Sequence, residues 1–380
     1  MKEGWTYRKL GEVCDILDYM RKPITKGKRE SGNIPYYGAT GCLDYVKDYI
    51  FDEKLVLLGE DGAKWGAGET SSYIINGKSW VNNHAHALRP NRNVLLDEVL
   101  VYYLNYANLM PFITGVTVPK LNQEKMRSIN VPIAPILEQQ RIVERLDAAF
   151  AHIDELKAKA EQQLAEARAL FQKSLAKAME PKEGWEEKKL EDLCINIVDC
   201  PHSTPRKVDY PTKYPCIRTS ELKGGKIEWE SMQYLDEEEY IVRTARIKPQ
   251  PNDIVYGREG TYGDAVLLPD GYFFSLGQRT MLFRPDINYV LPKFLHYSVI
   301  SSHVYEQAKA KNSGCGVGHV NVKDIKVFII CIPKSLSEQQ HIVERLDSLS
   351  ENVRKYEDIQ RKIITECDAL KQALLRKVFE

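Results

Sequence analysis

The chain has 380 residues with 53 basic and 53 acidic side chains, so its formal net charge is zero. This length exceeds one ordinary domain and allows two or more, and a hydrophobic fraction of 43% is enough for a sizeable core. The balanced charge argues against a protein that holds nucleic acid by a basic excess. Affinity for DNA would need cations sorted onto one face of each domain, or phosphate contacts supplied by a partner.

Cysteine usage and hydropathy predict a cytoplasmic protein with no membrane segment. The eight cysteines form no regular pairing pattern, which suits reduced thiols in a cytosol. Residues 1–5 lack the apolar core of a signal peptide, and the longest apolar run, residues 327–332, is far too short to cross a membrane. One group of zinc-ligand types fits no familiar zinc module in its spacing, so we predict no metal site; it comprises Cys194, Cys200, His202 and Cys216.

The sequence is a repeat of itself, and this feature decides the predicted architecture. Lys2-Glu3-Gly4-Trp5 recurs as Lys182-Glu183-Gly184-Trp185, and residues 138–147 recur as 338–347 with nine of ten positions identical. The weaker matches are residues 59–62 with 257–260, 88–90 with 283–285, 103–104 with 294–295, and Asn122 with Asn321. We expect two copies of one fold that carry different surfaces, and drift without functional contrast is the alternative.

Residues 15–134 are predicted to form a mixed α/β domain with many short strands. Runs of β-branched and aromatic residues predict strands at 55–58, 72–75, 86–88 and 129–133, and residues 97–108 predict a helix. Clusters of glycine, asparagine and aspartate separate these elements.

Residues 138–179 contain neither proline nor glycine and predict one long helix. Apolar residues at alternating steps of four and three form a heptad seam, the stripe along which two helices pack. The predicted inter-helix packing residues of this helix are Ile142, Leu146, Ile153, Leu156 and Leu170.

Residues 195–333 repeat the mixed α/β pattern, and a second long helix follows them. Strands are predicted at 254–256, 265–268, 280–283 and 326–332, and a helix at 291–309. The second seam has the same phase as the first and comprises Ile342, Leu346, Leu349, Val353, Ile363 and Leu370. Each long helix would extend ~60 Å at 1.5 Å per residue. We expect the two helices to pair antiparallel; a coiled coil that only dimerises the chain is the alternative.

Basic and aromatic residues near two repeated glycine turns predict DNA contacts, and so does one basic residue, Lys120 or His319, in each of the two small-residue loops that lead into the last strand. Glycine lets a backbone approach phosphate, lysine and arginine supply charge, and arginine can fork onto guanine. The candidate DNA-binding residues are Lys64, Trp65, Lys120, Arg258, Tyr262, Arg279, Lys311 and His319. Trp65 is also a candidate for the core. His84 and His86 lie one strand step apart, and we expect an ordinary surface or core pair rather than metal ligands.

These features together resemble the DNA specificity subunit of Type I restriction–modification systems. The resemblance covers the whole chain. It is carried by the opening Gly-Trp and Lys-Leu-Gly-Glu-Val, the approach Val131-Pro-Ile-Ala-Pro135, and the Glu-Gln-Gln-x-Ile-Val-Glu-Arg-Leu block that enters a long helix. It implies two target-recognition domains, each contacting one half of a split double-stranded DNA site. It also implies two methyltransferase subunits that bind S-adenosylmethionine, and restriction subunits that translocate with ATP and Mg²⁺.

The resemblance implies that this chain holds no catalytic residue and no cofactor, and the sequence agrees by omission. It contains no G-x-x-x-x-G-K-[ST] for ATP, no Asn/Asp-Pro-Pro-aromatic tetrapeptide for a flipped base, and no dinucleotide fingerprint. Two alternatives remain open. One is a DNA-modifying enzyme, and the other is a protein–protein scaffold that does not bind DNA.

The predicted fold class is α+β, with two similar recognition domains separated by two long antiparallel helices in a pseudo-two-fold, circular arrangement. The predicted boundaries are residues 1–137 and 181–337 for the recognition domains, and 138–180 and 338–380 for the spacer helices. Two non-identical domains imply an asymmetric, bipartite DNA site. The circular arrangement implies that the chain ends lie close together.

Overall fold

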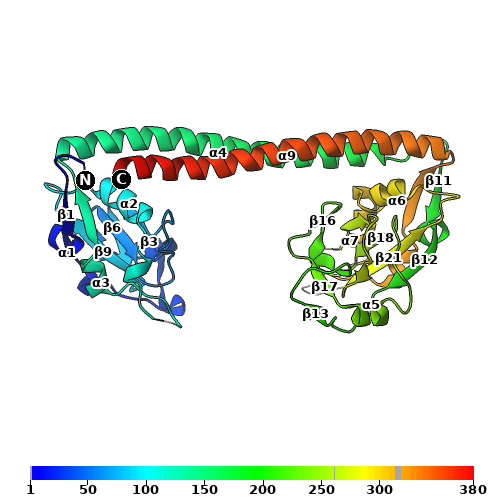
Figure 1. The fold of residues 1–380 in the computed structure, drawn as a ribbon, viewed down its shortest axis with the longest axis horizontal. Coiled ribbons are helices and arrows are strands. Elements are labelled where there is room, and N and C mark those ends of the chain that lie inside the picture. Colours follow the sequence, from blue (N-terminus) through cyan, green and yellow to red (C-terminus); the bar gives the residue numbers. More distant parts are fainter. Residues whose placement is uncertain (1, 116, 261, 313–317) are drawn as a thin grey trace. The chain divides into compact units, whose positions relative to one another are not determined.

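The computed structural model describes residues 2–115, 117–260, 262–312 and 318–380. The chain divides into two compact units. Unit 1 comprises Met1–Gln162 and Gln360–Glu380, and unit 2 comprises Gln163–Ile359. Each unit is therefore one mixed α/β domain together with a part of each long helix (Figure 1).

Unit 1 is built around a four-stranded antiparallel sheet in the order β2-β9-β6-β7. A second sheet has the order β4-β3-β8-β5, in which β3 and β8 are parallel, and β1 pairs with β10. The strands are β1 (Thr6–Lys9), β2 (Cys14–Ile16), β3 (Ser31–Gly38), β4 (Gly41–Val46), β5 (Phe51–Asp52), β6 (Leu55–Gly59), β7 (Ser72–Ile75), β8 (Lys78–Val81), β9 (Ala85–Pro90) and β10 (Asn130–Ile133). The helices of this domain are α1 (Leu10–Val13), α2 (Asp97–Tyr106) and α3 (Gln123–Arg127).

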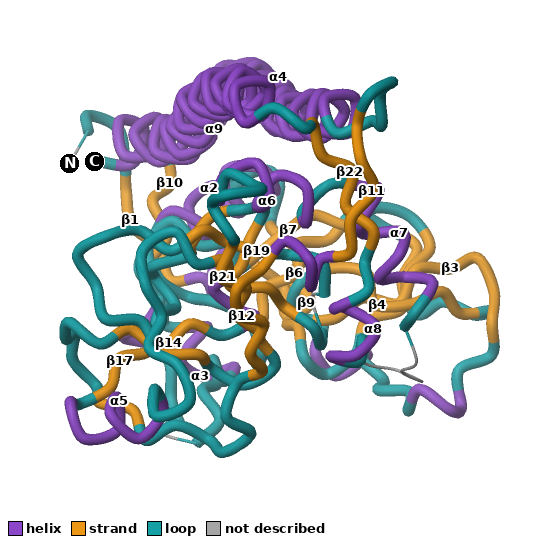
Figure 2. The backbone as a smooth tube through the Cα atoms, turned by 90° about the vertical axis from the view of Figure 1, so that its right-hand side faces the viewer, coloured by secondary structure: helices purple, strands orange, loops and turns teal. Residues whose placement is uncertain are grey.

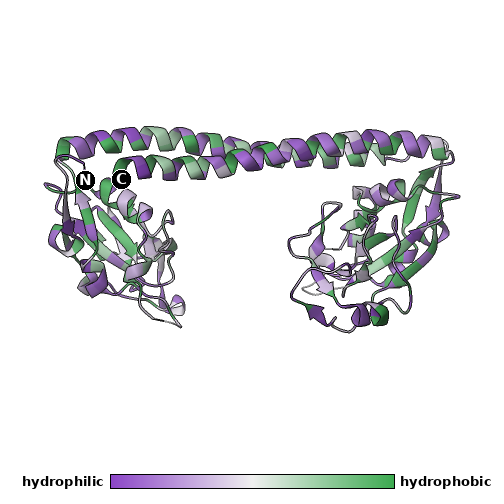
Figure 3. Cartoon of the chain, in the orientation of Figure 1, coloured by the Kyte–Doolittle hydropathy of each residue, from purple (hydrophilic) through white to green (hydrophobic). Residues whose placement is uncertain are grey.

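Strand β6 is buried on both faces, which explains its run of apolar residues. Val56 and Leu58 belong to one core cluster with Leu88 and Leu100. The alternate residues of the strand, Leu55 and Leu57, belong to a second cluster on the other face. The central sheet is thus a rigid layer that positions the loops at its ends (Figure 3 shows its apolar strands in green).

Unit 2 repeats this plan with the sheet β12-β21-β18-β19, alongside β13-β17-β14-β20, the β15-β16 hairpin and the pair β11-β22. The strands are β11 (Trp185–Lys189), β12 (Cys194–Asp199), β13 (Lys207–Val208), β14 (Pro215–Ile217), β15 (Leu222–Lys223), β16 (Lys226–Ile227), β17 (Gln233–Leu235), β18 (Ile254–Gly257), β19 (Ala265–Leu267), β20 (Ser275–Leu276), β21 (Thr280–Pro285) and β22 (Ile329–Pro333). The helices are α5 (Glu237–Arg243), α6 (Pro292–Val299), α7 (Ser302–Ala310) and α8 (Val322–Lys326).

Two predicted elements of unit 2 differ in the structure. The helix expected at 291–309 is two helices, because the chain turns at Ile300 and Ser301, where the Ser301 hydroxyl donates to the Ser298 carbonyl. Lys326 ends α8 and does not belong to the last strand, which begins at Ile329.

The two long helices are α4 (Ile136–Ala178) and α9 (Leu336–Phe379), and they pack together antiparallel as expected (Figures 1 and 2). In unit 1, Asp154 pairs with Lys371 and Lys157 with Asp368, so residue numbers rise along one helix as they fall along the other. Among the described residues, no helix combines the length and apolarity that a bilayer crossing requires.

The structure corrects the predicted seam. Leu156, Leu170 and Leu370 are 56%, 55% and 49% exposed and lie outside it. After Ile153 the buried stripe moves by one residue, through Lys157 to Ala160. The physical reason is that an α-helix has 3.6 residues per turn, so a strict heptad drifts about 20° per repeat. The remaining predicted packing residues are buried or half-buried: Ile142, Leu146, Ile153, Ile342, Leu346, Leu349, Val353 and Ile363.

Candidate nucleic-acid interface

Each domain is anchored to its long helix by a repeated set of side chains. The indole Nε1 of Trp5 donates to Glu138 at 2.9 Å, and that of Trp185 donates to Glu338 at 3.0 Å. The tryptophan of the opening Gly-Trp is thereby held by the first residue of the Glu-Gln-Gln block in both units. The two most specific sequence motifs of the repeat therefore serve one structural joint.

The next residue of the block, Gln139 or Gln339, is fully buried and forms three hydrogen bonds to backbone. Gln139 accepts from the Leu96 amide and donates to the carbonyls of Val94 and Ala134. Gln339 makes the same bonds to the Leu291 amide and to the carbonyls of Tyr289 and Pro333. The side chain thus fixes the segment that enters α2 or α6.

These bonds also correct one sequence match. Leu96 and Leu291 are equivalent because the two glutamines bind them identically. Counting from them, Phe294 corresponds to Val99, not to Tyr103. The bonds of Tyr102 to Asp147 and of Tyr297 to Asp347 agree with this alignment.

Charged side chains gather at the end of the central sheet that lies away from the joint with the long helix. We call this end the turn end. In unit 1 the turn end lies where β6 ends at Gly59 and β9 begins at Ala85, and in unit 2 where Gly257 meets Thr280. The backbone is the same in both units. The amides of Glu60 and Arg258 donate to the carbonyls of His84 and Arg279, respectively, and a loop before α3 or α8 bridges to the adjacent turn residue.

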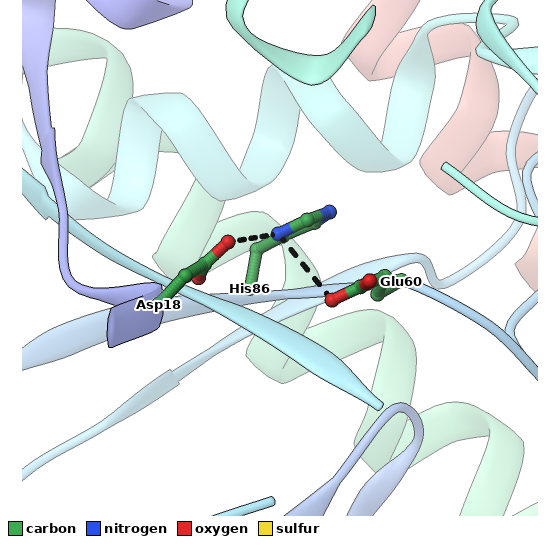
Figure 4. A group of neighbouring side chains, drawn as sticks. All are labelled: Asp18, Glu60 and His86. Atoms are coloured by element: carbon green, nitrogen blue, oxygen red, sulfur yellow. Dashed lines mark hydrogen bonds and ion pairs between the residues drawn. The ribbon is translucent and has the colours of Figure 1, made fainter. Parts of the chain in front are cut away.

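In unit 1, the buried Glu60 lies at the centre of the turn end. Its carboxylate pairs with Arg21 at 2.6 Å and with Lys120 at 2.8 Å. His86 lies between Glu60 and Asp18, with Nδ1 2.6 Å from Asp18 (Figure 4). The other ring nitrogen of His86 is 2.7 Å from the Leu121 carbonyl.

The carboxylates of this network are ionised through their partners. Burial alone would raise the pKa of Glu60, but hydrogen bonds from Lys120 and Arg21 lower it. Burial likewise opposes ionisation of Asp18, and the hydrogen bond from His86 lowers its pKa. Asp18, Glu60 and His86 are the one described group that brings three potential metal ligands together. Arg21 and Lys120 already supply cationic charge to these carboxylates, so the contacts describe an ion-pair network.

In unit 2, Arg258 takes the place of Glu60, and its partners are acidic. Its guanidinium is buried, with Nε 3.0 Å from Asp199 and Nη1 2.8 Å from Glu259. Glu259 also contacts His319 at 3.2 Å and Arg279 at 3.5 Å. The same backbone therefore holds a central carboxylate in one unit and a central guanidinium in the other.

The structure separates the predicted DNA-binding residues into exposed and enclosed ones. Trp65 is buried, and its Nε1 donates to the Gly59 carbonyl, so it belongs to the core. The buried Arg258 is engaged in ion pairs, and Tyr262 stacks on Tyr305 at 5.8 Å. The exposed or half-exposed candidates are Lys64, Lys120, Tyr262, Arg279, Lys311 and His319.

Sequence reasoning missed Arg21 and the pairing of His84 with Asp61. The repeated glycine turn pointed to Asp61, but nothing in the sequence showed that His84 lies beside it. The zinc-like group stays dispersed: Cys200 and Cys216 are buried in the core, and His202 is an exposed partner of Asp199.

The chain ends meet in unit 1, as the repeat predicts. The Lys2 ammonium donates to the carbonyls of Lys377 and Val378 at 2.7 and 2.5 Å. Trp5 packs against Phe379 with ring centroids 6.4 Å apart. In unit 2 the counterpart of Phe379 is the buried Met179, which two residues, Glu180 and Pro181, connect to Lys182.

Comparison with known proteins agrees with the repeat. The family model described as the Type I restriction modification DNA specificity domain matches residues 2–166 and again 182–363. The specificity subunit of the type I restriction enzyme EcoKI from Escherichia coli is 22% identical over 403 residues, which cover 99% of this chain and 85% of that protein. A Haemophilus influenzae protein named for a type I specificity subunit is 38% identical over 145 residues, only 37% of its length. The EcoBI specificity subunit of Escherichia coli is matched over 61% of its length.

Solved structures show the same fold. One chain from a study of complex assembly in a type I R-M system aligns over 100% of this chain and 98% of its own length, with a TM-score of 0.72 and 16% identity. The HsdS subunit from Thermoanaerobacter tengcongensis aligns over 100% of this chain with a TM-score of 0.51. Because the family model covers both halves of the repeat, the chain belongs to the family of Type I restriction–modification DNA specificity subunits.

Proposed function

We propose that this chain reads a bipartite, asymmetric DNA site, with one half-site bound by residues 1–137 and the other by residues 181–337. The observation that carries the proposal is the turn end. One backbone, held by the same tryptophan, glutamate and glutamine contacts, presents opposite charge patterns in the two units. Two domains of one fold with different polar surfaces are suited to reading two different sequences.

The proposed contacts are the exposed cations and hydrogen-bonding groups of the turn ends. Lys64, Lys120 and Lys311 would contact phosphate, and the exposed Arg279 and half-exposed His319 would also contact DNA. Arg258 and Tyr262 would act by positioning these neighbours, because the Arg258 guanidinium is buried in ion pairs and the half-buried Tyr262 ring stacks on Tyr305.

Residues 138–180 and 338–380 would set the distance between the half-sites and dock two methyltransferase subunits. S-adenosylmethionine, ATP and Mg²⁺ would bind to the methyltransferase and the restriction subunits, which carry out the catalysis. The complex would act on DNA in the cytoplasm.

A map of methylated adenines, made with and without the gene, tests this proposal. We expect one bipartite, non-palindromic motif to disappear when the gene is removed. A palindromic or uninterrupted motif would contradict two different readers. Binding to duplex DNA that does not respond to salt or sequence in the assembled complex would favour a protein scaffold.

A further inference from the structure

One exposed position recurs at both turn ends, and it follows from the strand registers. Gly59 pairs with Ala85 in unit 1, and Gly257 pairs with Thr280 in unit 2. The residue before each partner is therefore equivalent: His84 in unit 1 and Arg279 in unit 2. Their carbonyls accept from the equivalent turn amides at 2.8 and 3.0 Å.

Each of these side chains is held by the acidic residue of the adjacent glycine turn. The Nδ1 of His84 bonds to Asp61, and the Nε of Arg279 lies 3.5 Å from Glu259. The acids are themselves mostly enclosed, at 20% and 25% side-chain exposure, whereas His84 and Arg279 are 50% and 57% exposed. The turn acid thus contacts the inner nitrogen of each side chain, Nδ1 of His84 or Nε of Arg279, while the outer part of the side chain is exposed to solvent.

The outer nitrogens are unengaged within the described part of the chain. Those of Arg279 are its two Nη atoms, and that of His84 is Nε2. A carboxylate at Nδ1 places the ring proton there, so the Nε2 of a neutral His84 is an acceptor. The two Nη groups of Arg279 are donors only. One position therefore offers opposite hydrogen-bonding character in the two units.

The backbone of Arg279 supplies an independent observation. Its φ is +69°, in the left-handed region that favours glycine. Among the described residues, Asn252 is the other non-glycine residue with positive φ, and asparagine tolerates this conformation. Glycine would adopt this backbone conformation with less strain than arginine. The requirements of the fold therefore do not account for an arginine at this position.

We infer that His84 and Arg279 are the equivalent specificity-determining residues of the two domains, and that Asp61 and Glu259 position them. The inference rests on the proposed DNA-reading function and extends it to individual bases. The paired Nη donors of Arg279 match O6 and N7 of guanine in the major groove. The Nε2 acceptor of His84 matches the exocyclic amino group of adenine or cytosine.

The test uses the chain assembled with its methyltransferase subunit and a set of duplexes in which each base pair of the methylated motif is changed in turn. Arg279→Ala is expected to weaken binding roughly tenfold to a hundredfold and to abolish the preference for one guanine in one half-site. Replacing that guanine with 7-deazaguanine should weaken binding of the unsubstituted complex but not of R279A. Arg206→Ala, which removes an equally exposed arginine paired with Asp236, should leave the preference intact.

His84→Ala is expected to relax one position in the other half-site only. His84→Arg should change the preferred base at that position to guanine, because Asp61 would hold its Nε as Glu259 holds that of Arg279. Glu259→Gln should relax the same guanine as R279A, because the residue no longer holds the Arg279 Nε by an ion pair. It should also lower the unfolding temperature, because Glu259 pairs with the buried Arg258; the base preference, not the stability, is therefore the readout. Each variant leaves the opposite half-site as an internal control.

Base preferences that stay unchanged in both half-sites would overturn the inference. Equal weakening on all sequences, with a smaller salt dependence, would overturn it too, because it describes a phosphate contact. An unsubstituted complex that lacks a bipartite preference would instead contradict the proposed function itself.

Discussion

At the turn end of unit 1 the central residue is Glu60, and at the turn end of unit 2 it is Arg258. Both follow the last residue of a central strand, and both amides make the same backbone bond. Glu60 is surrounded by Arg21, Lys120 and His86, whereas Arg258 is surrounded by Asp199 and Glu259. Buried charges need partners of opposite sign, so reversing one residue requires its neighbours to change with it. The charged residues at the turn end of such a domain therefore change together, as one network of ion pairs.

The largest effect is expected when one member of a network is removed. Glu60→Ala would remove one of the two acids that Arg21 and His86 share and would leave Asp18 as the other. Arg258→Ala would remove the buried cation from Asp199 and Glu259. Each should lower the free energy of unfolding by about 3–5 kcal/mol. Chemical denaturation measures the loss, and hydrogen exchange in β6 or β18 assigns it to a unit. Glu30→Ala, which breaks an exposed pair with Lys47, should cost less than about 1 kcal/mol.

The shared framework should respond equally in both units. Gln139→Ala and Gln339→Ala each remove the side-chain partner of one buried and two part-buried backbone groups, so each should cost about 2–4 kcal/mol. The exposed neighbour Gln140→Ala should cost less than about 0.5 kcal/mol. A large loss in one unit and none in the other would show that the repeated bonds are not energetically equivalent.

Acid should distinguish the units. His296 of unit 2 occupies the position of Val101 in unit 1, and burial lowers its pKa from 6.5 to about 4. Its Nε2 bonds to the Ala265 carbonyl, and its buried Nδ1 has no hydrogen-bond partner among the residues that the structure describes. The unfolded chain binds this proton first, so the contribution of His296 to stability is complete above pH 6.5 and is lost as the pH falls to 4.

This loss amounts to about 3 kcal/mol at 1.36 kcal/mol per pKa unit. His296→Val, which installs the residue of unit 1, should flatten the decline in unfolding free energy between pH 6.5 and 4. An unchanged slope in the variant would assign the acid sensitivity of unit 2 to other groups.

The corrected seam gives a smaller effect. Ile153→Ala removes a buried side chain between α4 and α9 within unit 1 and should cost about 2 kcal/mol. Leu156→Ala, which the heptad pattern places in the same seam, should cost less than about 1 kcal/mol because the side chain is exposed. Thermal unfolding of the two variants measures both losses of stability. Equal losses would mean that Leu156 packs in the seam as the heptad pattern predicts.

The repeat made most of the fold predictable, because its signals are local or identical in sequence. The long helices follow from uninterrupted helical sequence, and the strands at Leu55–Gly59 and Thr280–Pro285 follow from apolar runs. The short strands β13 to β17 were not predicted, since strands of two or three residues are too short to show a periodic pattern and are defined only by their pairing.

The candidate site was predictable only in part. The repeated turn identified Arg258, and the small-residue loops identified Lys120 and His319. Their roles depend on which side chains lie opposite, and that is a tertiary property. Trp65 was placed among the contacts because it follows the first repeated glycine turn, but its indole is buried in the core and donates to the Gly59 carbonyl.

The smallest effect is expected where the two units differ only in chain continuity. In unit 2 two residues, Glu180 and Pro181, connect Met179 to Lys182. In the sequence, Glu380 and Met1 stand at the corresponding places between Phe379 and Lys2. Lys2 bonds to the carbonyls of Lys377 and Val378, so the first and last described residues of unit 1 lie close enough to be joined by a short link.

A direct bond from Glu380 to Met1, with new ends opened between Glu180 and Lys182, should therefore give a permuted chain of the same specificity. Its unfolding free energy should change by less than about 1 kcal/mol, because the opened segment is exposed and polar. A permutant opened at Ala160, inside the helix pair, should fail to fold because it interrupts a buried seam. If the first permutant methylates a different motif or needs a long linker, the ends of unit 1 are not equivalent to the continuous joint of unit 2.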